Sequence, residues 1–106
     1  MSVPEITIDD LALSLDKGGS LVDVRNTDEY VGGHIPSAQL IPLHDLDERW
    51  GELPSSRPLY IVCKSGARSS AAVRKLRERG IDAVSVAGGT DGWTASGRDT
   101  RTGRER

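Results

Sequence analysis

The only cysteine of the chain, Cys63, lies in a segment that favours a reactive thiol. Small residues at 65–67 allow the backbone to curl around the sulfur, so that successive N–H groups point inward. A helix that follows adds its positive N-terminal end, and Lys64 and Arg68 bring two cations to the same point. All of these features favour a thiolate over a thiol. We therefore expect Cys63 to be an activated nucleophile, held in the segment Cys63-Lys64-Ser65-Gly66-Ala67-Arg68-Ser69.

The two cations of this segment are expected to differ in role. Lys64 is placed on the rim, where a flexible ammonium can meet an incoming dianion. Arg68 closes the segment and is expected to donate hydrogen bonds into the loop and help hold the thiolate. Lys64 is the weaker indication of function, because an exposed lysine is usually only a solvated charge.

Other roles for Cys63 fit less well. A single cysteine is often a small buried hydrophobe, but such a residue would lie equally well inside a strand, whereas Cys63 begins a glycine-containing loop. It cannot form an intrachain disulfide, and a zinc site would need ligands from only two histidines and scattered carboxylates. We expect His34 to cap a turn or bind backbone, and we expect no metal and no cofactor.

The elements that must position this loop alternate between strands and helices. Apolar runs typical of strands cover residues 21–24, 38–41, 59–62 and 81–86. Helical patterns begin at Thr7 as an N-cap and at Asn26 with Glu29 as a capping box, continue partly through 42–53, and recur at 69–79 and 90–95. This alternation predicts an α/β fold, a mostly parallel sheet with helices on both faces.

The predicted strand at 59–62 leads directly into Cys63, at the carboxyl edge of the sheet, where α/β folds bind ligands. Asp23 and Arg25 stand at the end of the apolar run 21–24. We expect them to form an ion pair that fixes nearby loops rather than to act directly in catalysis.

Composition limits the remaining possibilities. The chain has 106 residues, enough for one domain, which we place at 1–97. Residues 98–106 are rich in arginine and have no apolar side chain, so we expect a mobile tail. The net charge of −2 favours neither nucleic acid nor an anionic membrane as a partner. No apolar stretch is long enough to span a bilayer and the N-terminus lacks a signal pattern, so we expect a cytoplasmic protein.

Three motifs, in order, resemble the rhodanese homology domain. The first comprises Leu21–Arg25, Glu29-Tyr30 and Gly33–Ala38; the second is Cys63–Ser69; the third is Gly88-Gly89 followed by Trp93. The family often continues through a Gly-x-Pro segment, whereas Gly97-Arg98-Asp99 lacks the proline.

The resemblance implies a rhodanese-like three-layer sandwich with a five-stranded sheet. It also implies a Cys63 nucleophile that accepts sulfane sulfur as a persulfide, and loop amides from residues 64–69 that hold the sulfur. The implied donor is a small sulfur-containing anion such as thiosulfate, and the implied acceptor is cyanide, a thiol or a protein.

Alternative functions stay open at this level. Cysteine phosphatases and arsenate reductases also use a thiolate in an amide-lined loop that ends in arginine, but they place five residues between the two, whereas four separate Cys63 from Arg68. The smaller ring better suits one sulfur atom. The chain could also be a protein-to-protein persulfide relay, or a binding module that has kept the fold without the chemistry.

Overall fold

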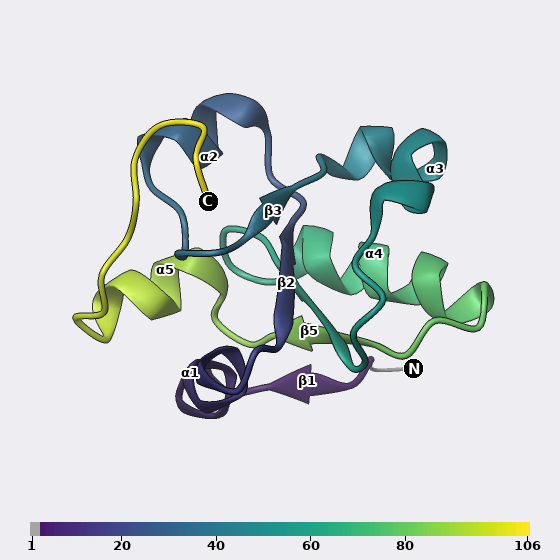
Figure 1. Ribbon diagram of the computed structural model, residues 1–106, viewed down its shortest axis with the longest axis horizontal. Coiled ribbons are helices and arrows are strands. Elements are labelled where there is room, and N and C mark those ends of the chain that lie inside the picture. The colour runs from purple at the N-terminus through teal and green to yellow at the C-terminus, as the bar shows by residue number, and fades with distance from the viewer. Residues whose placement is uncertain (1–2) are drawn as a thin grey trace.

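Five parallel strands form a single sheet in the computed structural model, which describes residues 3–106 (Figure 1). In chain order they are β1 (Glu5–Ile6), β2 (Ser20–Asp23), β3 (Gln39–Leu40), β4 (Leu59–Val62) and β5 (Ala83–Val86). The order across the sheet is β1-β5-β4-β2-β3, so β4, which leads to Cys63, is the central strand. Four of the strands match apolar runs predicted from the sequence.

The edge strand β1 was not predicted. The first pattern identified along the chain was the helix that begins at the N-cap Thr7. The strand has two residues and forms by pairing with a distant segment, Glu5 opposite Ser85 and Ile6 opposite Val86. So short an element has no periodicity of its own from which it could be predicted.

Helices cover both faces of the sheet. They are α1 (Ile8–Asp16), α2 (Thr27–Gly32), α3 (Leu46–Arg49), α4 (Ala67–Glu78) and α5 (Gly89–Ala95), and α3 is flanked by 3₁₀ turns at Leu43–Asp45 and Trp50–Glu52. The predicted N-cap of α1 is confirmed, because the Thr7 hydroxyl accepts from the Asp10 N–H at 3.1 Å. Within residues 3–106, none of these helices is long and apolar enough to cross a membrane.

The sheet separates two apolar clusters, because adjacent residues of a strand face opposite sides. In β4, Ile61 packs with Leu76 in the cluster beneath α3 and α4. Its neighbour Tyr60 packs with Leu11 and Trp93 in the cluster beneath α1, α2 and α5. The three-layer α/β sandwich predicted from the sequence is therefore confirmed.

The C-terminal segment, which we expect to be a mobile tail, lies along the domain in this structure. Residues 98–106 leave α5 and return along α2, as the yellow end of the ribbon shows (Figure 1). The backbone of Arg101 pairs with that of His34 in both directions, at 2.8 and 2.9 Å, and the Gly103 N–H donates to the Val31 carbonyl at 2.8 Å. These backbone hydrogen bonds need no apolar side chain, which is why the composition of the tail did not predict them.

Candidate active site

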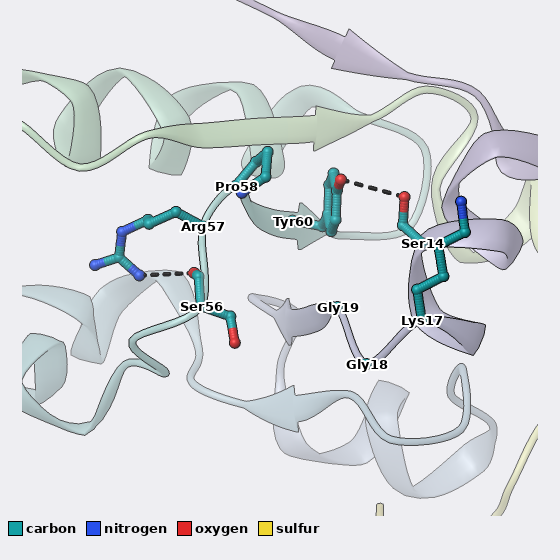
Figure 2. A pocket seen from close by; sticks show the side chains of 8 residues that line it. All are labelled: Ser14, Lys17, Gly18, Gly19, Ser56, Arg57, Pro58 and Tyr60. Atoms are coloured by element: carbon teal, nitrogen blue, oxygen red, sulfur yellow. Dashed lines mark hydrogen bonds between the residues drawn. The ribbon is translucent and has the colours of Figure 1, made fainter.

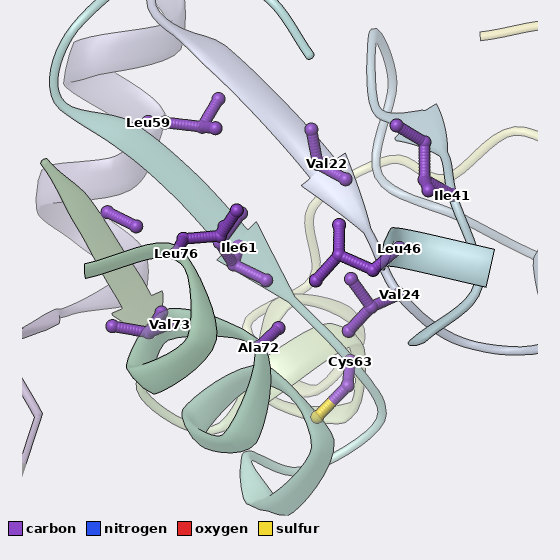
Figure 3. Packing of buried hydrophobic residues seen from close by; sticks show 11 residues of the cluster. Val22, Val24, Ile41, Leu46, Leu59, Ile61, Cys63, Ala72, Val73 and Leu76 are labelled. Atoms are coloured by element: carbon purple, nitrogen blue, oxygen red, sulfur yellow. The ribbon is translucent and has the colours of Figure 1, made fainter. Parts of the chain in front are cut away.

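Cys63 follows β4 directly and is 1% exposed. Figure 3 shows it at one end of the apolar cluster beneath α4, with its sulfur beside the first turn of that helix. The chain turns at Gly66, which has a φ of +141°, a backbone conformation that residues other than glycine rarely adopt. Helix α4 consequently begins at Ala67, two residues before the predicted start at Ser69. Arg68 and Ser69 thus belong to the first helical turn rather than to a loop.

Hydrogen bonds surround the sulfur on its helix side. The Gly66 N–H donates to Sγ at 3.1 Å, and the Cys63 thiol donates to the buried Ser69 hydroxyl at 3.4 Å. Burial of Cys63 raises the pKa of its thiol, but the Ser69 hydroxyl and the backbone amides of residues 69, 66 and 65 together outweigh it. The pKa of Cys63 is therefore lowered from its ordinary value. A thiol with a lowered pKa is more often present as the thiolate, which is the reactive nucleophile.

Arg68 does not donate into the loop as we expected. Its guanidinium binds the Glu29 carboxylate through both terminal nitrogens, at 2.6 and 2.9 Å. The hydrogen bond from Arg68 is the main cause that lowers the pKa of Glu29 to about 2. Glu29 also accepts from the Asn26 N–H at 3.1 Å, as the predicted capping box requires. One carboxylate therefore closes the start of α2 and ties it to the first turn of α4.

Lys64 lies on the rim, as predicted, and it has a partner there. Its ammonium contacts the Asp91 carboxylate at 3.1 and 3.3 Å, and the two side chains are 60% and 59% exposed. An ion pair this exposed contributes little to stability. Neither Asp91 nor Glu29 was predicted as a partner of these cations, because the members of the two pairs are 27 and 39 positions apart in the sequence.

The start of α5 holds the back of the Cys63 loop. The N–H and the hydroxyl of Thr90 both donate to the Cys63 carbonyl, at 2.8 and 3.0 Å, and the Asp91 N–H donates to the Lys64 carbonyl at 3.0 Å. Gly88 and Gly89, which belong to the third motif of the sequence, bring α5 against these carbonyls. The loop is thus held through its backbone carbonyls.

The expected ion pair between Asp23 and Arg25 is present. Both residues are buried, and the Arg25 guanidinium donates to both carboxylate oxygens at 2.8–3.1 Å. It also donates to the Gly33 carbonyl at 2.9 Å, so the pair ties the end of β2 to the chain after α2. This contact agrees with the supporting role that we expected.

His34 is also fully used in structural contacts. The buried ring stacks on Tyr30 with centroids 3.6 Å apart, and its two nitrogens lie 2.8 Å from the Tyr30 carbonyl and 2.6 Å from that of Glu105. This arrangement agrees with a histidine that binds backbone. Among residues 3–106 no group of three or more histidine, cysteine, aspartate and glutamate side chains is placed to hold a metal ion.

Two of the hollows that residues 3–106 line lie at opposite ends of the strands. One, of about 410 Å³, adjoins the Cys63 loop and is lined by Arg25, Asp28, Glu29, Gly32, Gly33, Lys64, Thr90, Asp91, Thr94 and Thr100. The other, of about 390 Å³, lies where β2 and β4 begin and is lined by residues 14, 17–19, 56–58 and 60 (Figure 2). In Figure 2, Tyr60 and Ser14 share a hydrogen bond of 3.2 Å across it. Of these two hollows, the first is at the cysteine end of the sheet.

Comparison with known proteins places this arrangement in a family. The family model described as a rhodanese-like domain matches residues 7–96. A sulfurtransferase of Allochromatium vinosum is 38% identical over 78 residues, which are 73% of this chain and 73% of that protein. YrkF of Bacillus subtilis is 38% identical over 96 residues, 88% of this chain, and the chain spans only 52% of YrkF.

Solved structures agree with this match. The crystal structure of a rhodanese-related protein from Thermoplasma volcanium superposes with a TM-score of 0.86 at 32% identity, and covers 92% of this chain and 97% of that one. The thiosulfate sulfurtransferase of Pseudomonas aeruginosa also gives a TM-score of 0.86, at 26% identity, over 98% of this chain and 21% of that one. With its five-stranded parallel sheet and its cysteine loop between β4 and α4, the chain belongs to the family of rhodanese-like domains.

Proposed function

We propose that the chain is a sulfurtransferase in which Cys63 carries sulfane sulfur as a persulfide. In the loading step the Cys63 thiolate attacks the outer sulfur of a donor such as thiosulfate. A sulfur–sulfur bond to Cys63 forms while the bond within the donor breaks, and sulfite leaves with the electron pair. In the unloading step a nucleophile such as cyanide or a thiolate attacks the terminal sulfur, and the Cys63 thiolate leaves.

The observation that carries this proposal is the environment of the Cys63 sulfur. A buried thiol with a lowered pKa lies between the Gly66 amide and the Ser69 hydroxyl, at the start of a twelve-residue helix. The first turn of a helix has amides without intrahelical partners, and its dipole favours a negative charge. The relatives that are named as sulfurtransferases support sulfur transfer as the general activity.

The rival functions have less support. Four residues separate Cys63 from Arg68, which makes a small ring for a tetrahedral oxyanion. The guanidinium of Arg68 is engaged by Glu29, where a phosphatase would use it on substrate. A binding module without chemistry would not require a buried cysteine whose pKa is lowered by convergent hydrogen bonds.

A persulfide relay is a second candidate, and one observation favours it over thiosulfate as the natural donor. Both cations of the segment 63–69 are already paired, Lys64 with Asp91 and Arg68 with Glu29. The rim therefore offers little unbalanced positive charge to a small dianion. A protein or thiol persulfide needs no such charge.

Initial rates test both candidates. Purified protein is assayed with thiosulfate and cyanide, and then with thiol and protein persulfide donors, beside a Cys63→Ser variant whose fold is checked by circular dichroism. We expect turnover that requires Cys63, with higher kcat/KM for persulfide donors than for thiosulfate. Equal turnover by a folded Cys63→Ser variant would refute the sulfurtransferase proposal.

A further inference from the structure

A second buried serine lies behind the reactive cysteine. Ser85 belongs to β5 and is fully buried, two residues from Ala83, which packs in the apolar cluster beneath α4. Among residues 3–106, the one side chain with which its hydroxyl shares a hydrogen bond is Ser69, at an Oγ–Oγ distance of 2.8 Å. A hydroxyl buried in an apolar layer is costly unless it is bonded, so this contact has to be kept.

The protons of the three groups can be counted. The Ser69 oxygen lies 3.4 Å from the Cys63 sulfur, 3.0 Å from the Gly66 carbonyl and 2.8 Å from the Ser85 oxygen. While Cys63 is a thiol it donates to Ser69, and the Ser69 proton goes to the Gly66 carbonyl, which can only accept. Ser85 is then left to donate its own proton to Ser69.

Loss of the thiol proton changes this pattern. The sulfur can now only accept, so the Ser69 hydroxyl turns from the Gly66 carbonyl toward Sγ. The proton of Ser85 still occupies a lone pair of the Ser69 oxygen, which holds that oxygen in place and strengthens its donation, because hydrogen bonds in a chain polarise one another.

We propose that Ser85 is a positioning residue for sulfur transfer, whose buried hydroxyl holds the Ser69 hydroxyl on the Cys63 sulfur whenever that sulfur is a thiolate. The thiolate is the nucleophile when sulfur is loaded and the leaving group when it is unloaded. The catalytic consequence rests on the proposed function, whereas the hydrogen-bond chain itself can be tested without it.

The test is the pH dependence of Cys63 alkylation by iodoacetamide in variants that form isosteric pairs. Ser85→Ala removes the hydroxyl and leaves the rest of the side chain unchanged. Ser85→Val differs from Ser85→Thr only in having a methyl group in place of the hydroxyl. We expect Ser85→Ala to alkylate about threefold to tenfold more slowly than the native protein at pH 7, the size of one hydrogen bond, and at the native rate at high pH. Ser85→Val should be slower than Ser85→Thr by a similar factor.

A merely structural role for Ser85 gives the opposite sign. Loosening of β5 would expose Cys63, a residue that is now 1% exposed, and alkylation would become faster at every pH. Ala83→Gly, on the same face of β5, is the control for such loosening. Faster alkylation in Ser85→Ala, or equal rates for Ser85→Val and Ser85→Thr, overturns the proposal.

A double-mutant cycle tests the route through Ser69. In a Ser69→Ala background, Ser85→Ala should have no further effect on the alkylation profile, since the group that it positions is gone. Additive effects would overturn the proposal. A profile that shifts as expected in a protein that transfers no sulfur would refute the proposed function alone, and an unchanged profile in an active protein would refute the role of Ser85 alone.

Discussion

Gly89 is the position at which one methyl group should damage the site most. It is the first residue of α5, with φ of +61°. A Cβ at this position would lie 2.3 Å from the Lys64 carbonyl oxygen, 2.5 Å from its carbon and 2.8 Å from the Cys63 carbonyl oxygen. All three are backbone atoms of the loop that holds the reactive sulfur, so no side-chain rotation can relieve the overlap.

The structure gives the size of the effect for Gly89→Ala. Relief of the overlap requires α5 and the loop to separate by about 1 Å, since carbon contacts are favourable only beyond roughly 3.5 Å. That displacement weakens three hydrogen bonds, from the Thr90 N–H, the Thr90 hydroxyl and the Asp91 N–H. With about 1 kcal/mol for each bond and a further 1–2 kcal/mol for a left-handed alanine, we expect a loss of about 4–5 kcal/mol.

Gly88→Ala is the matched control for Gly89→Ala. Gly88 also has a positive φ, +84°, but its nearest contact for a Cβ is 3.6 Å away, at the Gly92 Cα, which is ordinary van der Waals distance. It should therefore lose only about 1–2 kcal/mol, from the left-handed backbone. Urea unfolding followed by circular dichroism measures both, and alkylation of Cys63 in the native state reports the loop. Equal losses in the two variants would refute the reasoning, because both place an alanine at a position with positive φ and only Gly89→Ala adds the clash with the loop.

Three further predictions concern contacts of the site and of the C-terminal segment. Glu29→Gln should cost about 1 kcal/mol at neutral pH, a figure reduced because the Glu29 and Arg68 side chains are 29% and 33% exposed. The native pKa of Glu29, about 2, lies below the ordinary 4.5. The ion pair therefore contributes its full stability above pH 4.5, and this contribution disappears as the pH falls through 2. A difference between the urea midpoints of the native protein and Glu29→Gln that does not shrink on acidification contradicts this. Asp91→Asn should release Lys64 and lower the KM for thiosulfate, whereas Lys64→Ala should raise this KM. Both changes in KM should be smaller in high salt. Steady-state kinetics in which the two variants do not change the KM in opposite directions contradict this. Removal of residues 99–106 should cost about 2 kcal/mol because backbone hydrogen bonds to α2 and His34 are lost. An unchanged thermal melt would contradict this cost and support a mobile tail.

Local patterns predicted most of the fold. Thr7 and the Asn26-Glu29 pair marked the starts of two helices, because capping depends on residues only three apart. The run at 59–62 was recognised because a strand buried on both faces is continuously apolar. The same kind of local pattern is enough to place Cys63 between a strand and a helix, at the carboxyl edge of the sheet.

Contacts between distant segments could not be predicted in this way. The partners of Lys64 and Arg68 come from α5 and α2. The sequence contains many carboxylates, and nothing in it indicates which of them will pair with which cation. Ser85 looked like an ordinary strand residue, since only the packing of β5 against α4 brings its hydroxyl to Ser69. The docking of the C-terminal segment depends on backbone groups that every residue has.

Intact-protein mass spectrometry tests the central claim most directly. The native protein and Cys63→Ser are incubated with thiosulfate or with a thiol persulfide, separated from the donor, and weighed before and after addition of cyanide. We predict that the native protein gains the mass of one sulfur atom, that cyanide removes it, and that Cys63→Ser gains nothing. A native protein that gains no sulfur from any donor, or a Cys63→Ser variant that gains the same mass, would contradict a persulfide on Cys63.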